Sequence, residues 1–188
     1  MVISNESKLF GYVLGEILAS MSSLDQVSIG FEIKSKRNAY SYIVFKNGTK
    51  ICSFAIYLKT SSKRLAPWRF TFLKEHQEYI DELYDTHDDV FLALINGNDG
   101  VACFNYETLK ILLDDHFDES EWVSVRRKSG EQYTVAGKDG KLTGKLPLSE
   151  FPSVIVNFIS KKMNPDEVSQ TGRSHEDSTA RRKLFGFL

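Results

Sequence analysis

The spacing of hydrophobic residues changes along the chain between a helical and a strand-like period. In "SNESKLFGYVLGEILASM" (4–21), apolar residues recur every three to four positions from Leu9 to Leu18, which predicts an amphipathic helix. Ser4 or Asn5 is the expected N-cap, because a short polar side chain there can accept a hydrogen bond from a free backbone N–H. The first predicted element is therefore a helix with one buried face.

Three strand-like segments follow this helix. Apolar and polar residues alternate in "VSIGFEIKS" (27–35), which predicts a half-buried strand. The segment "AYSYIVFK" (39–46) is followed by Asn47-Gly48, a pair typical of tight hairpin turns. The third segment, "TKICSFAIYLK" (49–59), is apolar on both sides, as expected of a central strand. We therefore predict a three-stranded meander.

The next part of the chain predicts a helix, two strands and a second helix. A basic, proline-containing loop (60–69) leads into "FTFLKEHQEYIDELYDTH" (70–87), which has helical periodicity with one apolar face. A short continuous apolar run (90–95) indicates a buried strand, and "VACFN" (101–105) indicates another. The segment "YETLKILLDDHF" (106–117) is a short amphipathic helix.

After residue 121 the pattern becomes that of a glycine-rich β-ribbon. Strand-like alternation interrupted by glycines over 121–152 predicts two or three short strands. The segment "LSEFPSVIVNFISKKM" (148–163) predicts a short helix that packs on the core. The predicted organisation is a single α/β domain (1–160, with a core at 7–113 and the ribbon and packing helix at 121–160), a flexible linker (161–180) and a hydrophobic tail (181–188).

Composition restricts the class of protein more than its activity. The 188 residues are 41% hydrophobic and 26% charged, which is ordinary for one soluble domain. The net charge of −1 gives no global attraction to nucleic acid, so any such binding needs a local basic patch. Cys52 and Cys103 lie in apolar runs, which favours buried thiols in a reducing compartment. With no signal-like start and no long apolar run, we expect a cytoplasmic protein without membrane association.

The order of these elements resembles a known nuclease core. A helix, three strands, a helix and a strand over residues 7–113 are similar to the αβββαβ core of the PD-(D/E)XK, or restriction-endonuclease-like, superfamily. The resemblance implies an α/β (α+β) fold, with a central mixed sheet flanked by helices. It also implies a magnesium site. In that family an acid on the second strand, an acid-X-lysine on the third and often an acid on the first helix surround Mg²⁺.

The chain matches only part of this catalytic pattern. Lys59 occupies the lysine position, but Tyr57 replaces the acid two positions earlier, and the second strand has no acid. Glu16 is the one acid at a familiar place on the first helix. An alternative is that Glu32, in the acid-X-lysine "EIK", acts together with Asp25. The resemblance therefore implies a degenerate, non-catalytic member, with Lys59, Glu16 and Glu32 as catalytic candidates only if the chain is an active magnesium nuclease.

Local clusters of basic residues suggest contacts with nucleic acid. Lysines and arginines hold phosphates, and an aromatic side chain between them can stack on a base. Two clusters lie in the loop after the third strand and on the ribbon. The candidate nucleic-acid-binding residues are Lys59, Lys63, Arg64, Trp68, Arg69, Arg126, Arg127 and Lys128.

Other motifs of metal or nucleotide chemistry are absent or weak. The four histidines are scattered, so the sequence predicts no zinc site and no resident metal. The segment "GKDGKLTGK" (137–145) lacks the spacing of a phosphate-binding loop and predicts a lysine-bearing turn. The segment "DDHFDESE" (114–121) is acidic enough to attract a divalent ion, but it lacks calcium-loop spacing and is more typical of a solvated linker.

The sequence ends in a short hydrophobic motif, "RRKLFGFL". It resembles the peptides by which DNA-processing proteins bind sliding clamps, and also the Arg-X-Leu-Phe motif of cyclin-binding proteins. Large apolar side chains after a polar stretch are expected to dock on another surface. The predicted docking residues are Arg182, Leu184, Phe185, Phe187 and Leu188.

Three functions remain open from the sequence. The first is a non-catalytic DNA-associated protein that binds nucleic acid or a DNA-processing partner and docks its tail on a protein such as a sliding clamp. The second is a divergent magnesium-dependent nuclease, with Mg²⁺ as its only cofactor. The third is a protein-interaction module, an inhibitor or assembly factor, without a nucleic-acid role. The sequence leaves a homodimer open.

Overall fold

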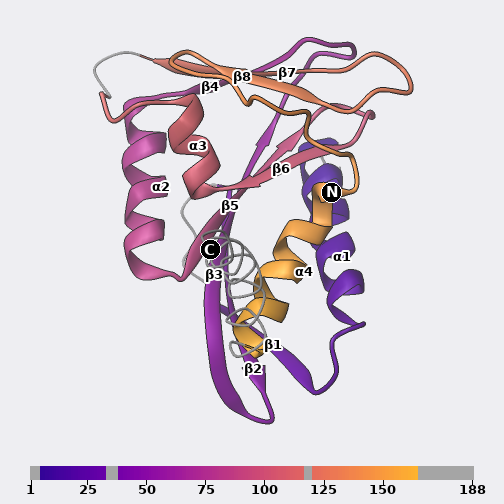
Figure 1. Ribbon diagram of the computed structural model, residues 1–188, viewed down its shortest axis with the longest axis vertical. Helices are drawn as coiled ribbons and strands as arrows, with labels where there is room; N and C mark the ends of the chain where they lie inside the picture. Colours follow the sequence, from indigo (N-terminus) through magenta and orange to yellow (C-terminus); the bar gives the residue numbers. More distant parts are fainter. Residues whose placement is uncertain (1–4, 33–37, 117–119, 165–188) are drawn as a thin grey trace, which may run out of the picture.

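A mixed five-stranded sheet forms the centre of the computed structural model, which describes residues 5–32, 38–116 and 120–164 (Figure 1). The strand order is β1-β2-β3-β5-β6, with antiparallel pairs throughout except for the parallel pair β3–β5. These strands are β1 (Val27–Glu32), β2 (Ala39–Lys46), β3 (Thr49–Thr60), β5 (Asp89–Ile95) and β6 (Val101–Asn105). The predicted meander and the mixed central sheet are therefore confirmed, and the fold is α+β.

Helices cover both faces of this sheet. One face carries α1 (Asn5–Met21) and α4 (Glu150–Met163), and the other carries α2 (Lys74–Thr86) and α3 (Tyr106–Leu112) (Figure 1). Strand β3 supplies both cores, because successive side chains point to opposite faces. Phe54, Ile56 and Leu58 pack with α1 and α4, whereas Ala55 and Tyr57 pack with α2 and α3. The sequence expectations for the first helix and for the packing helix are confirmed.

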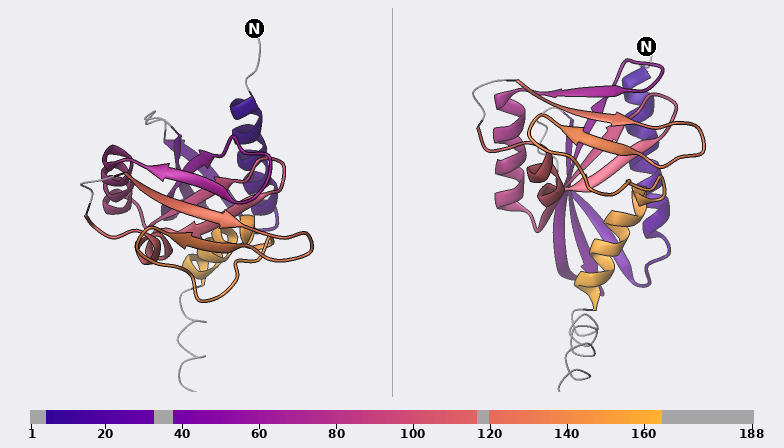
Figure 2. Two further views of the ribbon diagram at one scale, coloured as in Figure 1. Left: turned by 90° about the horizontal axis from the view of Figure 1, so that it is seen from above. Right: turned by 45° about the horizontal axis from the view of Figure 1, so that its top comes forward.

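A second, three-stranded antiparallel sheet lies across one end of the first (Figure 2). It contains β4 (Trp68–Phe72), β7 (Glu121–Arg126) and β8 (Thr134–Gly137), in the order β4-β7-β8. Strands β7 and β8 are the predicted ribbon. The third strand comes from a distant part of the chain, since β4 lies between β3 and α2.

The assignment of residues 68–72 to a loop and the start of a helix is wrong. Every second side chain of β4 is buried, so Trp68, Phe70 and Phe72 pack into the core while Arg69 and Thr71 remain exposed. This period-two pattern fits a strand that covers the α2–α3 side of the main sheet and pairs with β7. Helix α2 consequently begins at Lys74 rather than near residue 70.

Among the residues described, no helix combines the length and the apolar character needed to cross a bilayer. The longest, α1, has 17 residues.

Candidate functional site

The candidate site lies where the parallel strands β3 and β5 end. Thr60 and Ile95 are the last partners of this pair, and the backbone N–H of Ser61 still donates to the carbonyl of Ile95 at 3.1 Å. In sheets with parallel strands, ligands commonly bind just outside the carboxyl ends of the strands. Lys59 is the penultimate residue of β3 and so projects its side chain at this edge.

Among the described residues, the direct contacts of the half-buried Lys59 ammonium group are with uncharged groups. Its Nζ donates to the carbonyl oxygen of Thr71 at 2.7 Å and lies 3.2 Å from Nδ1 of His76. The ring of Phe72 is 4.8 Å away. Within the described residues no carboxylate forms an ion pair with this lysine. Burial lowers the pKa of Lys59 from 10.5 to about 8, because nothing nearby compensates the desolvated charge.

His76 supports Lys59 from the first turn of α2. Its Nδ1 accepts hydrogen bonds from the backbone N–H of Leu73 at 3.1 Å and from Lys59 Nζ, which places the proton of the neutral ring on Nε2. Burial and the charge of Lys59 both lower the pKa of His76. At neutral pH the imidazole is therefore an uncharged acceptor.

The amino-terminal end of α2 adds a second positive feature beside Lys59. Leu73 is the N-cap and offers no side-chain acceptor to the first turn of the helix. The free N–H groups at a helix start carry partial positive charge, and this raises the cost of placing a cation there. A bound anion would compensate both the helix start and the ammonium group.

A polar pocket of about 350 Å³ opens next to Lys59. Hydroxyl and basic side chains dominate its wall, and none of the described residues that line it is acidic. The lining residues are Asn38, Lys59, Thr60, Ser61, Ser62, Lys63, Arg69, Phe70 and Thr71. The structure thus brings together three of the predicted basic residues, Lys59, Lys63 and Arg69, in a pocket whose chemistry suits a phosphate group.

The basic side chains around the pocket differ in exposure and in the contacts that they make. Lys63 and Arg64 are exposed and form no ion pair with any described residue. The guanidinium carbon of Arg69 lies 4.3 Å from the ring centre of Trp122, a cation–π contact that fixes its direction. Arg64 lies in the same loop but does not line the pocket.

Trp68 does not have the position that the sequence analysis expected. Its side chain is 3% exposed, its Nε1 donates to the carbonyl of Lys63 at 3.2 Å, and its ring meets that of Tyr133 edge to face. A buried indole cannot stack on a base, so the role of Trp68 is to hold the basic loop in place. The half-buried ring beside the pocket is instead Trp122, which the sequence analysis did not select.

The basic residues of the ribbon are also divided. Arg126 and Lys128 are exposed. Arg127 instead forms a bidentate ion pair with Asp99, with nitrogen–oxygen distances of 2.6 and 2.8 Å. Tyr133 donates to the same carboxylate at 3.0 Å. Arg127 therefore ties the second sheet to the turn between β5 and β6 and is not available to a ligand.

The backbone positions of the three candidate acids lie away from Lys59. Glu16 lies on α1, which covers the opposite face of the sheet from Tyr57 and Lys59. Asp25 is exposed in the turn before β1, and Glu32 is the last residue of that strand, so the six-residue strand separates the two acids. Glu32 pairs with Ser41, opposite Ala55 of β3, four residues before Lys59.

Tyr57 cannot replace the missing acid. Its side chain is 2% exposed and lies between the rings of His76 and Tyr79. Burial raises the pKa of Tyr57 to about 12, so the phenol is neutral and a poor ligand for Mg²⁺. The described site can therefore hold an anion, but it lacks the carboxylates that would activate water on a metal.

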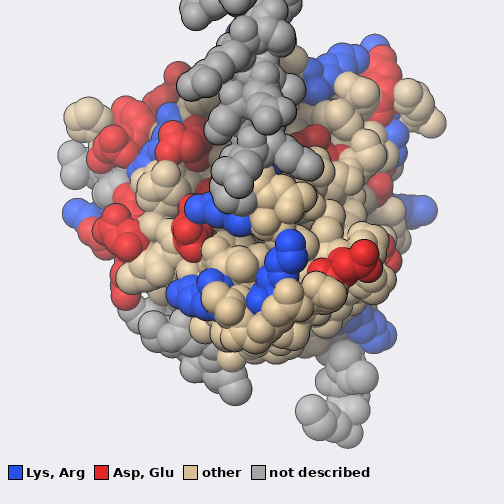
Figure 3. Space-filling view, turned by 60° about the horizontal axis from the view of Figure 1, so that its bottom comes forward, with Lys and Arg blue, Asp and Glu red and all other residues tan. Residues whose placement is uncertain are grey.

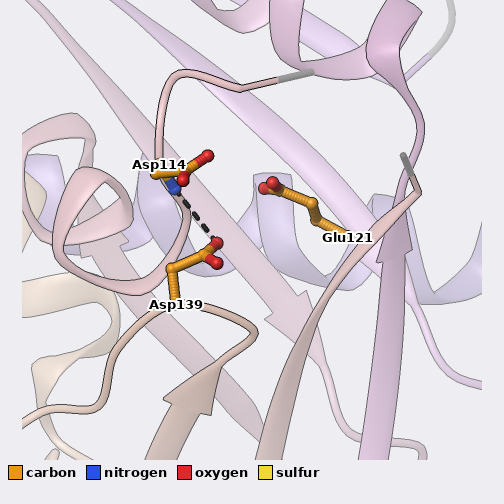
Figure 4. Close-up of side chains that lie close together, drawn as sticks. All are labelled: Asp114, Glu121 and Asp139. Carbon is orange, nitrogen blue, oxygen red and sulfur yellow. Dashed lines mark hydrogen bonds between the residues drawn. The ribbon is translucent and has the colours of Figure 1, made fainter. Parts of the chain in front are cut away.

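A cluster of three carboxylates lies away from Lys59, and sequence reasoning missed it. The ligand oxygens of Asp114, Glu121 and Asp139 all lie within 4.8 Å of one another (Figure 4). The sequence analysis considered Asp114 and Glu121 part of a solvated linker, but Glu121 is buried. Asp139 belongs to the lysine-bearing turn, and nothing in the sequence relates that turn to residues 114–121.

Charge elsewhere on the surface is mixed. On the end of the molecule away from the second sheet, basic and acidic side chains are interspersed among uncharged residues (Figure 3). This face offers no broad single-sign area, which agrees with the near-zero net charge. The predicted docking residues 182–188 lie outside the described part of the chain.

Comparison with protein-family models, curated proteins and solved structures finds no match to this chain. Its function must therefore be argued from its own residues.

Proposed function

We propose that the chain is a non-catalytic nucleic-acid-binding protein with a restriction-endonuclease-like core, in which Lys59 holds a backbone phosphate. Apart from β4, which lies between β3 and α2 and belongs to the second sheet, the order α1, β1–β3, α2 and β5, with β5 parallel to β3, agrees with the αβββαβ pattern of that superfamily. The observation that carries the proposal is the half-buried ammonium of Lys59, which lies beside the start of a helix and a polar pocket and has no carboxylate partner among the described residues. A phosphate oxygen would supply the missing charge.

Flanking cations extend the same interaction along a nucleic-acid backbone. Lys63 and Arg64 are exposed beside the pocket, Arg69 lines it, and Arg126 and Lys128 are exposed on the second sheet. Contacts of this kind hold the backbone without selecting a sequence. The proposed protein therefore binds nucleic acid in a salt-dependent manner, and the tail at 181–188 remains the proposed docking segment for a DNA-processing protein such as a sliding clamp.

Binding of fluorescent single-stranded and duplex DNA by the full chain, measured by anisotropy between 50 and 200 mM salt, tests this proposal. Lys59→Met should weaken binding about 10- to 100-fold, since a charge-assisted hydrogen bond contributes about 1.5–3 kcal/mol. For duplex DNA it should also reduce the salt slope by about 0.9 for the lost phosphate contact. Lys50→Met, at the other end of β3, is the matched control and should leave both unchanged. Undetectable binding at low salt, or equal binding by Lys59→Met, would overturn the proposal.

The nuclease alternative has less support, because the described residues place no acid beside Lys59. It predicts cleavage of plasmid or single-stranded DNA with Mg²⁺ or Mn²⁺. Cleavage that is lost in both Lys59→Met and Glu16→Gln would restore it, whereas intact DNA in the presence of either metal agrees with binding alone.

A further inference from the structure

The acidic cluster is assembled from three separate segments. Asp114 follows α3, Glu121 opens β7, and Asp139 lies in the turn after β8. Figure 4 shows the carboxylate of Glu121 directed toward the two aspartates. Oxygens that bind one calcium ion at 2.3–2.6 Å can be at most about 5 Å apart. The 4.8 Å limit on the distances in this cluster is therefore compatible with one shared cation.

Glu121 distinguishes this cluster from an ordinary acidic surface. Its side chain is 1% exposed, and its Oε2 has no hydrogen-bond partner among the described residues. The side chain of Gln77 is close enough to favour the charged form, yet its buried Nε2 is also without a partner in the same set. An unsatisfied buried carboxylate is costly unless a proton or a cation compensates it.

Tight backbone packing holds the cluster in place. A Cβ atom on Gly137 would lie 2.0 Å from the carbonyl oxygen of Leu112, and one on Gly140 would lie 2.0 Å from that of Ile111. Because glycine has no side chain, the turn can pack directly against the end of α3. There the N–H of Asp139 donates to Leu112 at 3.1 Å, and the N–H of Asp114 donates to Oδ2 of Asp139 at 3.2 Å. The carboxylates are thus positioned before any ligand binds.

Nearby cations do not balance the three carboxylates. Lys138 favours the ionised forms of Asp114 and Glu121, and His116 contacts Asp114 through its backbone N–H at 2.8 Å and its Nδ1 at 3.3 Å. The next acid, Asp115, is paired with Lys110 instead. The one positive charge of Lys138 is fewer than the three negative charges that the ionised carboxylates would carry.

From this geometry we infer that Asp114, Glu121 and Asp139 bind a hard divalent cation of the calcium and magnesium class. Carboxylate oxygens are the ligands that such ions prefer, whereas zinc and copper favour nitrogen and sulfur. The two exposed aspartates leave the outer side of the ion open to water. This site is independent of the proposed phosphate site, because it shares none of the residues that line the Lys59 pocket.

Thermal unfolding of the full chain with Ca²⁺, Mg²⁺ or Mn²⁺, after treatment with a chelator, tests the inference without nucleic acid. At 100 times the dissociation constant, one of these ions should raise Tm by about 5–10 °C. Calorimetric titration should give one site. Tb³⁺, a calcium-sized probe, should show emission sensitised by Trp122, the neighbour of Glu121 in sequence.

Glu121→Gln and Asp139→Asn should each abolish the saturable Tm shift and the Tb³⁺ signal. Asp85→Asn, an exposed acid near the end of α2, is the matched control and should retain both. If Glu121→Gln does not fold, Asp139→Asn decides, since Asp139 is exposed. No saturable effect in the wild type, or the same effect in Asp139→Asn, would overturn the inference. Glu121 would then be a buried, protonated carboxyl group.

Discussion

The Lys59 pocket and the acidic cluster carry uncompensated charges of opposite sign, and strand β4 contacts both. Thr71 of β4 accepts the hydrogen bond of Lys59, and Phe72, the next residue, pairs with Glu121 of β7. Most of the polar residues of the Lys59 pocket are neighbours in sequence, from Lys59 to Lys63. The acidic cluster instead combines three residues from separate segments, at positions 114, 121 and 139. Both arrangements leave a charge that a small ligand could compensate, but only the first follows from neighbouring residues.

The two sites are also expected to respond to pH in opposite directions. Burial lowers the pKa of Lys59, and burial together with like charges raises that of Glu121. Each shift favours the neutral form. The free energy of unfolding should therefore rise with pH because of Lys59 and fall with pH because of Glu121, in separate pH ranges.

The largest expected effect is a loss of stability when the packing that positions the acidic cluster is disrupted. Gly137→Ala places a Cβ atom against the backbone of Leu112, so the turn and α3 must separate. We expect a loss of about 3 kcal/mol or more in the free energy of unfolding, measured with urea. Gly144→Ala is the control, because the space around Gly144 is open, and it should change stability by less than about 0.5 kcal/mol. Equal stability of the two variants would show that the turn does not press on α3.

The second effect concerns the cation. With its pKa lowered from 10.5 to about 8, Lys59 loses its proton in the folded chain before it does in the unfolded chain. The unfolded state then binds more protons between these values. The stability of the wild type relative to Lys59→Met should therefore increase from pH 8 to pH 10.5, by an amount on the order of 3 kcal/mol. Urea unfolding of both proteins across this range measures the difference, and a flat difference would mean that the ammonium is well solvated.

The smallest effect concerns the buried acid. Without metal, the raised pKa of Glu121 makes the folded state bind more protons than the unfolded state just above the ordinary pKa of 4.5. Wild-type stability relative to Glu121→Gln should thus fall as the pH rises through this window, and at neutral pH the variant should be more stable by about 1 kcal/mol. Unfolding in the presence of a chelator checks this. A wild type that is more stable than the variant at neutral pH would indicate a satisfied carboxylate.

The sequence contained most of the information about the main sheet. The periodicity of α1, the Asn47-Gly48 hairpin and the two-sided apolar character of β3 are local patterns, and each gave the observed element. Lys59, Lys63 and Arg69 could be grouped for the same reason, because they lie at the end of one strand and in the segment that follows it.

Contacts between distant segments could not be read in this way. The alternation of Trp68, Phe70 and Phe72 was visible, but its partner strand begins at residue 121. Arg127 and Trp68 are residue types that often contact ligands. In the structure Arg127 instead binds Asp99, about 30 residues away in sequence, and Trp68 packs on Tyr133, about 65 residues away. Asp139 reaches Asp114 only because Gly137 and Gly140 permit close packing.

The alternation within β4 makes the length of this strand as important as its composition. One residue inserted into 68–72 would invert the pattern on one side of the insertion, so that a buried side chain such as Trp68 or Phe72 would face solvent. The Thr71 carbonyl would leave Lys59, and Glu121 would lose its pairing with Phe72. Insertions are tolerable at the exposed tip of the preceding loop, around Arg64 and Leu65. Both sites therefore depend on an exact count of residues in β4, which lines the Lys59 pocket and pairs with the strand that begins at Glu121.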